Sequence, residues 1–298
     1  MKILSPAKVN LYLDIVGKRK DGYHKIETIF QTVSLYDTVE VSPAGPNGPS
    51  IALTVISQRG EKSACPPNHE NIVWKAAKLF FETFNLKKSC RIVLTKNIPI
   101  QAGLGGGSSN AASTLKALSR IFLKNRSSKE TKKLLRKIAC RLGADVPFFL
   151  EGGCALASGI GEKIVPLPSP QKFWLVILKP EIGLSTREVY QWFDWETNRP
   201  KRLTYRSNLN KIKVLITKNK GVQDWGICIH NSFERIVLKK VPELGKAKER
   251  LLRVGSLNAS LSGSGSAFFG IALSKADGER IQENLKRFYP KVWLVHSV

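Results

Sequence analysis

A glycine-rich segment constrains the fold of this chain more than any other feature. It reads Gly103-Leu104-Gly105-Gly106-Gly107-Ser108-Ser109. A strand pattern from Cys90 to Leu94 precedes it, and small and apolar residues from Ser108 to Phe122 favour a helix packed on a sheet. Glycine permits positive φ and close approach, so consecutive N–H groups can point at a polyphosphate, as does the positive end of the helix. The segment therefore predicts a phosphate-binding loop.

Two common phosphate loops do not fit this segment. A Walker A loop requires Gly-Lys-Ser/Thr, and no lysine lies between Pro99 and Asn110. A dinucleotide fingerprint would place glycine or alanine where Ser108 stands, inside a parallel βαβ unit that the chain does not suggest. A flexible hairpin or a packing turn is the structural alternative, which four glycines and two serines at a helix start disfavour. A different kind of phosphate loop is therefore expected.

The pattern along the chain predicts an α+β protein of two domains. Before the loop we expect β-hairpins from Val9 to Val41 with a turn at 18–22, a loop over 42–50, a strand over 51–56 and a helix from Asn71. After it we expect a helix over 129–142 and strands around Ala155 and Ile164. The proline-rich stretch 166–170 marks a boundary, so the domains are residues 1–168, which bind ATP, and 169–298, on the substrate side. In the second domain we expect strands over 173–178 and 257–261 and at the end, and helices over 187–193 and from Asn208, Asn231 and Ala276.

Charge and cysteine content leave several partner classes open. The 298 residues carry a net charge of +25, which would attract nucleic acid, an acidic membrane or a small polyanion alike. No basic-aromatic repeat accompanies the charge, so we expect solvated basic faces and no nucleic-acid partner. The five cysteines lack C-x-x-C spacing, which suits a reducing cytosol. No stretch approaches the ~18 apolar residues of a membrane span. We expect a cytoplasmic protein with no membrane partner, and the oligomeric state stays open.

Three ordered motifs resemble a known family. The run from Pro99 to Ala112 resembles the second motif of the galactokinase, homoserine kinase, mevalonate kinase and phosphomevalonate kinase (GHMP) family. Ser5-Pro6-Ala7-Lys8-Val9-Asn10-Leu11 and Leu261-Ser262-Gly263-Ser264-Gly265-Ser266-Ala267 match the motifs before and after it. The resemblance implies a first domain like ribosomal protein S5 domain 2, a second that is ferredoxin-like, and ATP and Mg²⁺ as cofactors.

Further segments resemble the branch of this family that acts on a cytidine diphosphate-linked alcohol. They are Asp21-Gly22-Tyr23-His24, Glu70-Asn71 and Gly143-Ala144-Asp145-Val146-Pro147-Phe148-Phe149. The resemblance implies ATP-dependent phosphorylation of a hydroxyl of such a small molecule, in isoprenoid precursor synthesis. Residues 185–195 are harder to align, so substrate contacts from that region stay open. The segment 124–133 departs from the family pattern without affecting the assignment.

Asp145 and Lys8 are the candidate catalytic residues. Asp145 follows a predicted helix and has apolar neighbours that could hold it rigidly as a proton acceptor, or it could be a simple turn residue. Lys8 starts an apolar strand, an unusual place for a charge unless it faces a site, although an early lysine is commonly surface. The resemblance makes Lys8 the partner of Asp145, where its ammonium would lower the carboxyl pKa and stabilise developing charge.

The remaining candidate residues follow from the resemblance. For ATP they are Asn71, Lys96, Pro99, Ile100, Gln101, Ala102, Gly103, Leu104, Gly105, Gly106, Gly107, Ser108 and Ser109. For the substrate they are Asn10, Tyr23, His24, Tyr190, Gly263, Ser264 and Gly265. Asn71 could instead be only a helix N-cap, and the Gly-Ser-Gly segment only a turn. The four histidines have no metal-ligand spacing, so no protein-held metal is expected.

Two other functions compete with this prediction. The first is another kinase of the same family, acting on mevalonate, homoserine or a sugar; Tyr23 and His24 favour a cytidine compound instead. The second is a basic RNA-binding protein, because ribosomal proteins share the implied fold. A binding module has no need of a phosphate loop combined with Lys8 and Asp145, which favours the enzyme.

Overall fold

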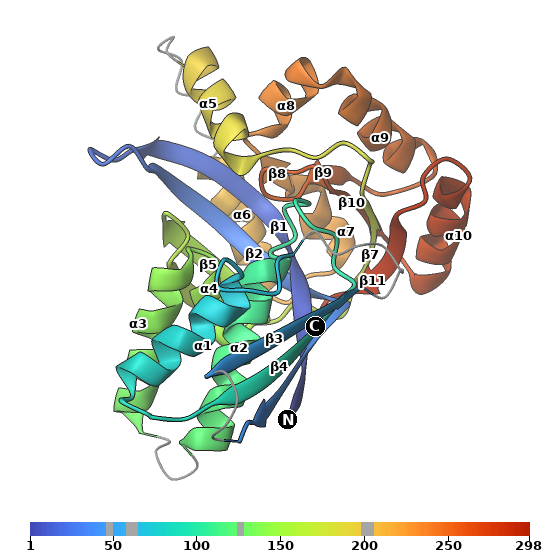
Figure 1. Cartoon of the computed structure of the whole chain (residues 1–298). Helices are drawn as coiled ribbons and strands as arrows, with labels where there is room; N and C mark the ends of the chain where they lie inside the picture. Colours follow the sequence, from blue (N-terminus) through green and yellow to red (C-terminus); the bar gives the residue numbers. More distant parts are fainter. Residues whose placement is uncertain (46–49, 58–64, 124–127, 198–205) are drawn as a thin grey trace. The chain divides into compact units, whose positions relative to one another are not determined.

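The chain divides into two compact units whose segments alternate along the sequence. In this computed structural model, residues 1–45, 50–57, 65–123, 128–197 and 206–298 are described. Unit 1 comprises 1–7, 35–100 and 105–151, and unit 2 comprises 8–34, 101–104 and 152–298. Figure 1 colours the chain by sequence. The two long strands, β1 (Lys2–Lys18) and β2 (His24–Pro43), therefore contribute residues to both units.

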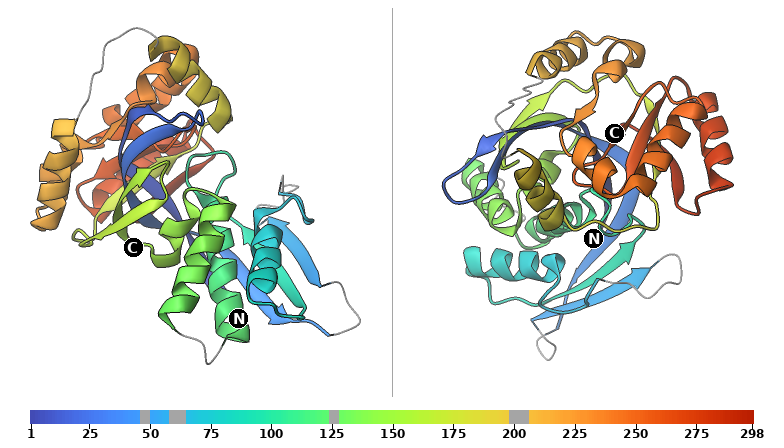
Figure 2. Two further views of the ribbon diagram at one scale, coloured as in Figure 1. Left: turned by 90° about the vertical axis from the view of Figure 1, so that its left-hand side faces the viewer. Right: turned by 90° about the horizontal axis from the view of Figure 1, so that it is seen from above.

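Unit 1 combines a short mixed sheet with a layer of helices. Strand β3 (Ile51–Ser57) runs parallel to β4 (Cys90–Lys96), which pairs antiparallel with the end of β2 from Thr38 onward. The helices are α1 (Ile72–Thr83), α2 (Gly106–Phe122), α3 (Lys129–Leu142) and α4 (Val146–Glu151). Helices α1, α2 and α3 lie side by side and contact one another (Figures 1 and 2).

Helix α1 shows why this layer forms. Its apolar residues Val73, Ala76, Ala77 and Phe80 recur at helical spacing and are fully buried. The side chain of Asn71 caps the helix by accepting from the backbone N–H of Val73. Burial and capping together fix the start and the orientation of the helix.

Unit 2 contains two sets of strands. In the first, β1 pairs in parallel with β8 (His230–Asn231), and β2 pairs antiparallel with β5 (Cys154–Gly159), which pairs with β6 (Lys163–Leu167). The second is an antiparallel sheet in the order β11-β7-β10-β9. Its strands are β7 (Trp174–Leu178), β9 (Ala259–Leu261), β10 (Phe268–Ala272) and β11 (Val292–His296).

Unit 2 also has several helices, and those at Pro242–Arg253 and Lys275–Lys286 contact the strands of the antiparallel sheet. The helices are α5 (Thr186–Thr197), α6 (Arg206–Thr217), α7 (Val222–Trp225), α8 (Glu234–Lys240), α9 (Pro242–Arg253) and α10 (Lys275–Lys286), with a 3₁₀ turn at Gly226–Cys228. Leu251 of α9, Ile281 of α10 and Phe268 of β10 belong to one buried cluster, together with Phe233. This cluster supports the segments that carry the candidate substrate residues.

The α+β class that the sequence predicts is confirmed. The first hairpin, α1 and α3 fall where expected, but the predicted helix from Asn231 is wrong at its start. Asn231 ends β8, because its amide bonds to the carbonyls of Leu261 and Gly263, and α8 begins only at Glu234. Strand β10 and helix α4 were not expected. The predicted break at 166–170 starts inside β6; among the described strands β6 pairs with β5 alone, and this edge position tolerates Pro166.

Two composition-based expectations can be compared with the described residues. Within them, no helix combines the length and the apolar character needed to cross a membrane. The five cysteines form no disulfide with one another, and burial raises the pKa of Cys90 and of Cys154 to about 12. Because the thiolate is the reactive form of cysteine, these two buried thiols have low reactivity. The domain boundary at residue 168 and the cytoplasmic location stay predictions.

Candidate active site

The glycine-rich loop leads directly into helix α2 of unit 1. Gly105, in the left-handed region at φ 68°, is the N-cap, and the helix starts at Gly106. The N–H of Ser109 bonds back to the carbonyl of Gly105 at 2.9 Å. An α-helix leaves its first N–H groups without intrahelical acceptors, so Gly106, Gly107 and Ser108 present donors at the positive end of a 17-residue helix. This is a suitable site for phosphate oxygens.

A buried polar network lies beneath this helix start. Asp37 is fully buried, forms an ion pair with Lys96, and accepts from the amide of Asn110 at 2.9 Å. Asn110 also donates to Ser5 Oγ at 3.0 Å, and Ser5 Oγ donates to Ser109 Oγ at 2.8 Å. Ser109 is therefore a buried member of the network, whereas Ser108, half-buried, is the serine better placed for a ligand.

Two predicted ATP residues in unit 1 have protein partners of their own. Lys96 Nζ bonds to Asp37 and to Asn110 Oδ1, and a Cβ on Gly106 would come within 3.3 Å of it. Lys96 thus lies at the base of the loop. Asn71 is the N-cap of α1, the alternative that the sequence left open, and its amide nitrogen donates to the carbonyl of Pro66 at 2.8 Å.

Asp145 lies in the short connection between two helices. Helix α3 ends at Leu142 and Gly143 caps it, so the half-buried Asp145 follows a helix as the sequence suggested; it also directly precedes α4, which starts at Val146 and was not expected. Lys8 belongs to the other unit. The pairing of Asp145 with Lys8 therefore stays a prediction.

In unit 2 the first, second and last sequence motifs meet around Lys8. The backbone N–H of Lys8 donates to the carbonyl of Leu104 at 2.9 Å, and its buried ammonium donates to Asn10 Oδ1 at 2.5 Å. A Cβ on Gly263 would lie 3.3 Å from that ammonium and 3.2 Å from the carbonyl of Gly103. With φ +55° and these tight contacts, position 263 favours glycine.

Gly103 has a packing role that the sequence did not suggest, and its contact with ATP stays a prediction. At φ +72°, its added Cβ would lie 1.9 Å from the carbonyl oxygen of Ser262, and Ser262 Oγ donates to the carbonyl of Gly103 at 3.0 Å. This glycine lets the loop pack against the last motif. The residues that precede Gly103 in the loop differ in burial. Pro99 is half-buried, and Ile100 and Gln101 are exposed. Ala102 is buried, and its carbonyl accepts from the backbone N–H of Ala267.

Asn231 and Asn10 hold the neighbouring backbone in place. The amide of Asn231 donates to the carbonyls of Leu261 at 2.7 Å and Gly263 at 2.8 Å, and sequence reasoning missed this role. No local pattern marks it. Asn10, besides accepting from Lys8, donates to Thr28 Oγ1 at 2.8 Å. Asn10 and Lys8 thus share one face of β1, as the period of two predicts.

The last motif also packs tightly on its own unit. Ser264 is buried and its hydroxyl lies 2.8 Å from that of Thr186. A Cβ on Gly265 would come within 2.9 Å of Leu261 and 3.1 Å of Leu184. These contacts make the segment an ordered loop beside Lys8.

Of the predicted cytidine residues, the structure brings His24 and Tyr190 of unit 2 into ring contact and does not bring Tyr23 to them. His24 stacks on Tyr190 with ring centres 4.8 Å apart, and its Nε2 lies 2.6 Å from a carboxylate oxygen of Asp194. Tyr23 is exposed at 62%. The sequence proposed Tyr190 as a stacking face for the base, and the structure places that ring against His24. Asp194 was missed, because one acidic residue on an amphipathic helix has no distinguishing signal.

Comparison with known proteins defines the family. Residues 71–153 match the GHMP kinases N terminal domain and residues 213–291 the GHMP kinases C terminal domain. A curated relative from Clostridium beijerinckii, 4-diphosphocytidyl-2-C-methyl-D-erythritol kinase, is 37% identical over 300 residues and spans 100% of both chains.

The chain belongs to the GHMP kinases. It is therefore an ATP-dependent small-molecule kinase, which confirms the prediction from the motifs. A relative of the same name from Clostridium tetani is 38% identical over 302 residues, again with 100% of both chains covered.

Solved structures agree with this assignment. A crystal structure of 4-(cytidine 5'-diphospho)-2C-methyl-D-erythritol kinase is 32% identical, has a TM-score of 0.77, and is matched over 100% of this chain and 99% of that chain. Homoserine kinase from Cytophaga hutchinsonii, at 20% identity and a TM-score of 0.76 over 100% of this chain and 94% of that chain, shares the fold.

Proposed function

We propose that the chain transfers the γ-phosphate of ATP to a hydroxyl of 4-diphosphocytidyl-2-C-methyl-D-erythritol, giving the 2-phosphate and ADP. This reaction belongs to the methylerythritol phosphate route to isoprenoid precursors. The observation that carries the proposal is the meeting of three distant motifs around the buried ammonium of Lys8. The choice of substrate rests on relatives of that name matched over their whole length.

The start of helix α2 would hold the phosphates of ATP. The N–H groups of Gly106, Gly107 and Ser108 donate to phosphate oxygens, and the half-buried hydroxyl of Ser108 is available to Mg²⁺. In the described residues, no group of three or more His, Cys, Asp or Glu side chains is placed to hold a metal. The hydroxyl of Ser108 would be the group of this chain that helps to hold an ion brought in by ATP. When bound, it neutralises charge on the phosphates.

Asp145 and Lys8 would act on the acceptor alcohol. The hydroxyl oxygen attacks the γ-phosphorus and its proton passes to the Asp145 carboxylate, while the bond from the γ-phosphorus to the bridging oxygen breaks and ADP leaves. The Lys8 ammonium, held by Asn10, stabilises negative charge on the transferred group. In a loose transition state the hydroxyl needs little help from a base. Positioning by these residues is therefore a large part of the rate enhancement.

The proposal assigns a division of labour along the chain. Residues 1–168 would bind ATP and residues 169–298 the substrate side, in a cytoplasmic enzyme. Tyr23 would stack on the cytosine ring and His24 would bind its polar edge. Base stacking is typically worth about 1–3 kcal/mol, which corresponds to roughly a 5- to 150-fold change in affinity.

The test is ATP consumption with a panel of alcohols, namely 4-diphosphocytidyl-2-C-methyl-D-erythritol, mevalonate, homoserine and galactose. We expect turnover only with the first, and phosphorus NMR should show a new phosphomonoester beside ADP. Asp145→Asn serves as the matched control for contaminating kinase. Turnover of another alcohol, or none of the first, would reject the proposed substrate.

A further inference from the structure

A carboxylate holds the candidate base-reading histidine. Asp194 Oδ1 lies 2.6 Å from His24 Nε2, and its Oδ2 accepts from Lys18 Nζ at 2.6 Å. The His24 side chain is only 8% exposed and that of Asp194 38%. All three residues belong to unit 2, although His24 and Asp194 are 170 positions apart. The contact is thus a product of the fold.

The carboxylate decides which ring nitrogen of His24 carries the proton. Burial acts to raise the pKa of Asp194, but hydrogen bonds from Lys18 and His24 outweigh it and hold that pKa below its ordinary value. An ionised carboxylate only accepts hydrogen bonds. The proton of a neutral His24 ring therefore lies on Nε2, and Nδ1 keeps a lone pair.

Aromatic neighbours fix the direction of that lone pair. Tyr190 stacks on the His24 ring at an interplanar angle of 30°. Phe193 contacts the same ring edge-on, with the ring centres 6.3 Å apart. Tyr190 in turn packs on buried Phe233, with the ring centres 4.7 Å apart, so the stack is anchored in the core of unit 2. In the part of the chain that the structure describes, Nδ1 bonds to no protein atom. With one ring face covered, His24 offers a ligand an edge acceptor.

We propose that Asp194 sets the base specificity of this kinase: by holding His24 as the Nε2–H tautomer, it leaves Nδ1 to accept from the exocyclic amino group of cytosine. The inference rests on the proposed function and deepens it. Uracil carries a carbonyl in place of that amino group, so two acceptors would face each other and both would lose a partner. Uracil could offer its N3–H only by sliding one ring position relative to its ribose. Asp194 is a positioning residue that acts through His24.

The tautomer can be measured without any substrate. Nitrogen-15 NMR of histidine-labelled protein separates protonated from unprotonated ring nitrogens, and His24→Gln assigns the signals among the four histidines. When the His24 ring of the wild-type chain carries one proton, the spectrum should show a protonated Nε2 and an unprotonated Nδ1. In Asp194→Asn the amide can accept or donate, so both tautomers should be populated.

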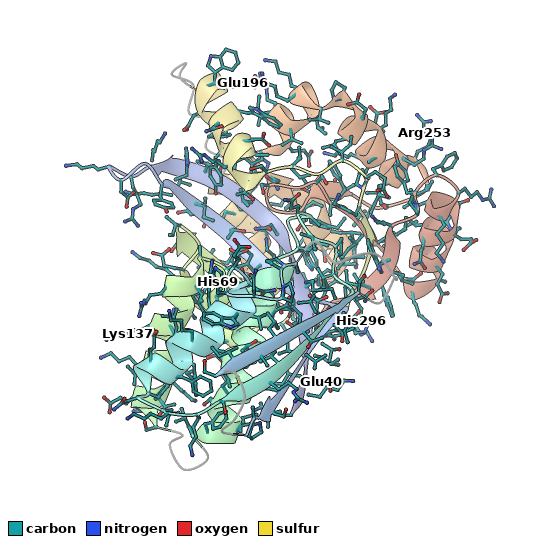
Figure 3. All side chains as sticks on the ribbon, viewed as in Figure 1. Glu40, His69, Lys137, Glu196, Arg253 and His296 are labelled. Atoms are coloured by element: carbon teal, nitrogen blue, oxygen red, sulfur yellow. The ribbon has the colours of Figure 1, made fainter. Side chains whose placement is uncertain are left out.

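Specificity is measured with the cytidine-linked and the uridine-linked alcohol. Wild-type kcat/KM should favour cytidine by roughly 5- to 150-fold, the range expected when a polar group is left unpaired. Asp194→Asn should reduce this preference at least about fivefold, with the KM for ATP unchanged. Glu196→Gln is the matched control, because Glu196 lies on the same helix α5 (Figure 3), pairs with Lys239 at 2.9 Å and should leave the preference intact.

The outcomes separate this inference from the proposed function. An Nδ1–H tautomer in the wild type, or an unchanged preference in Asp194→Asn, overturns the role of Asp194. Absence of turnover with the cytidine-linked alcohol overturns the proposed function instead. Calorimetric titration of CDP and UDP then still decides the inference: tighter CDP binding that weakens in Asp194→Asn supports it, and equal or no binding overturns it.

Discussion

Gly103→Ala tests whether this glycine serves packing between backbone segments. Gly103 has φ +72°, and a Cβ there would lie 1.9 Å from the carbonyl oxygen and 2.8 Å from the carbonyl carbon of Ser262. These are backbone atoms that no rotamer change can move. Gly153→Ala is a matched control, because Gly153 has φ +73° and its Cβ would meet only Ser169 Oγ at 3.8 Å, an ordinary contact.

The two variants share one cost and differ in another. Alanine in the left-handed region costs about 1–2 kcal/mol at either position. At Gly103 the Ser262 carbonyl must also move by roughly 1 Å to reach a tolerable separation. That movement disrupts the bond from the Gly265 N–H to Ser262 at 2.9 Å and the one from Ser262 Oγ to Gly103 at 3.0 Å. At about 0.5–1.5 kcal/mol each, Gly103→Ala should cost about 1–3 kcal/mol more than the control.

Urea unfolding of the wild type and both variants measures this difference. Gly103→Ala should also lower kcat more than Gly153→Ala, because the loop carbonyl of Leu104 accepts from the N–H of Lys8. The nucleotide affinity of the same three proteins is a second measure of how far each substitution disturbs the loop. Equal destabilisation by the two substitutions would show that Ser262 yields without cost, and the packing argument for Gly103 would then be wrong.

Asp145→Asn should lower kcat by ~10²–10⁴-fold with ATP binding nearly intact, and adding Lys8→Ala should cost little more; an additive double-mutant cycle would separate the two residues. Ser108→Ala should raise the KM for ATP, whereas Ser109→Ala should lower thermal stability, since only Ser109 is buried in a hydrogen-bond network; identical effects would contradict this. Burial lowers the pKa of His230 from 6.5, so the unfolded state binds more protons and stability falls as pH drops below about 6.5. His230→Asn should flatten the decline of the urea midpoint between pH 6.5 and 5.

The sequence by itself determined the class of fold and the kind of chemistry. The glycine loop, the strand before it and the helix after it are local features, and each residue type acts there through its own backbone preference. Residues 72–83 and 129–142 likewise alternate apolar and polar side chains at helical spacing, which a single sequence displays directly. Three ordered motifs were then sufficient to predict a kinase.

Only the tertiary structure decided which partner each of these residues has. Lys96 pairs with Asp37, 59 positions away, and His24 with Asp194, 170 positions away. Gly103 belongs to the predicted phosphate loop, and the structure adds that its missing side chain makes room for Ser262. Such contacts depend on the path of the chain through two units with interleaved segments, and a lone aspartate or asparagine carries no local mark of a distant partner. Specificity is therefore expected to depend on residues that sequence reasoning leaves among ordinary surface positions.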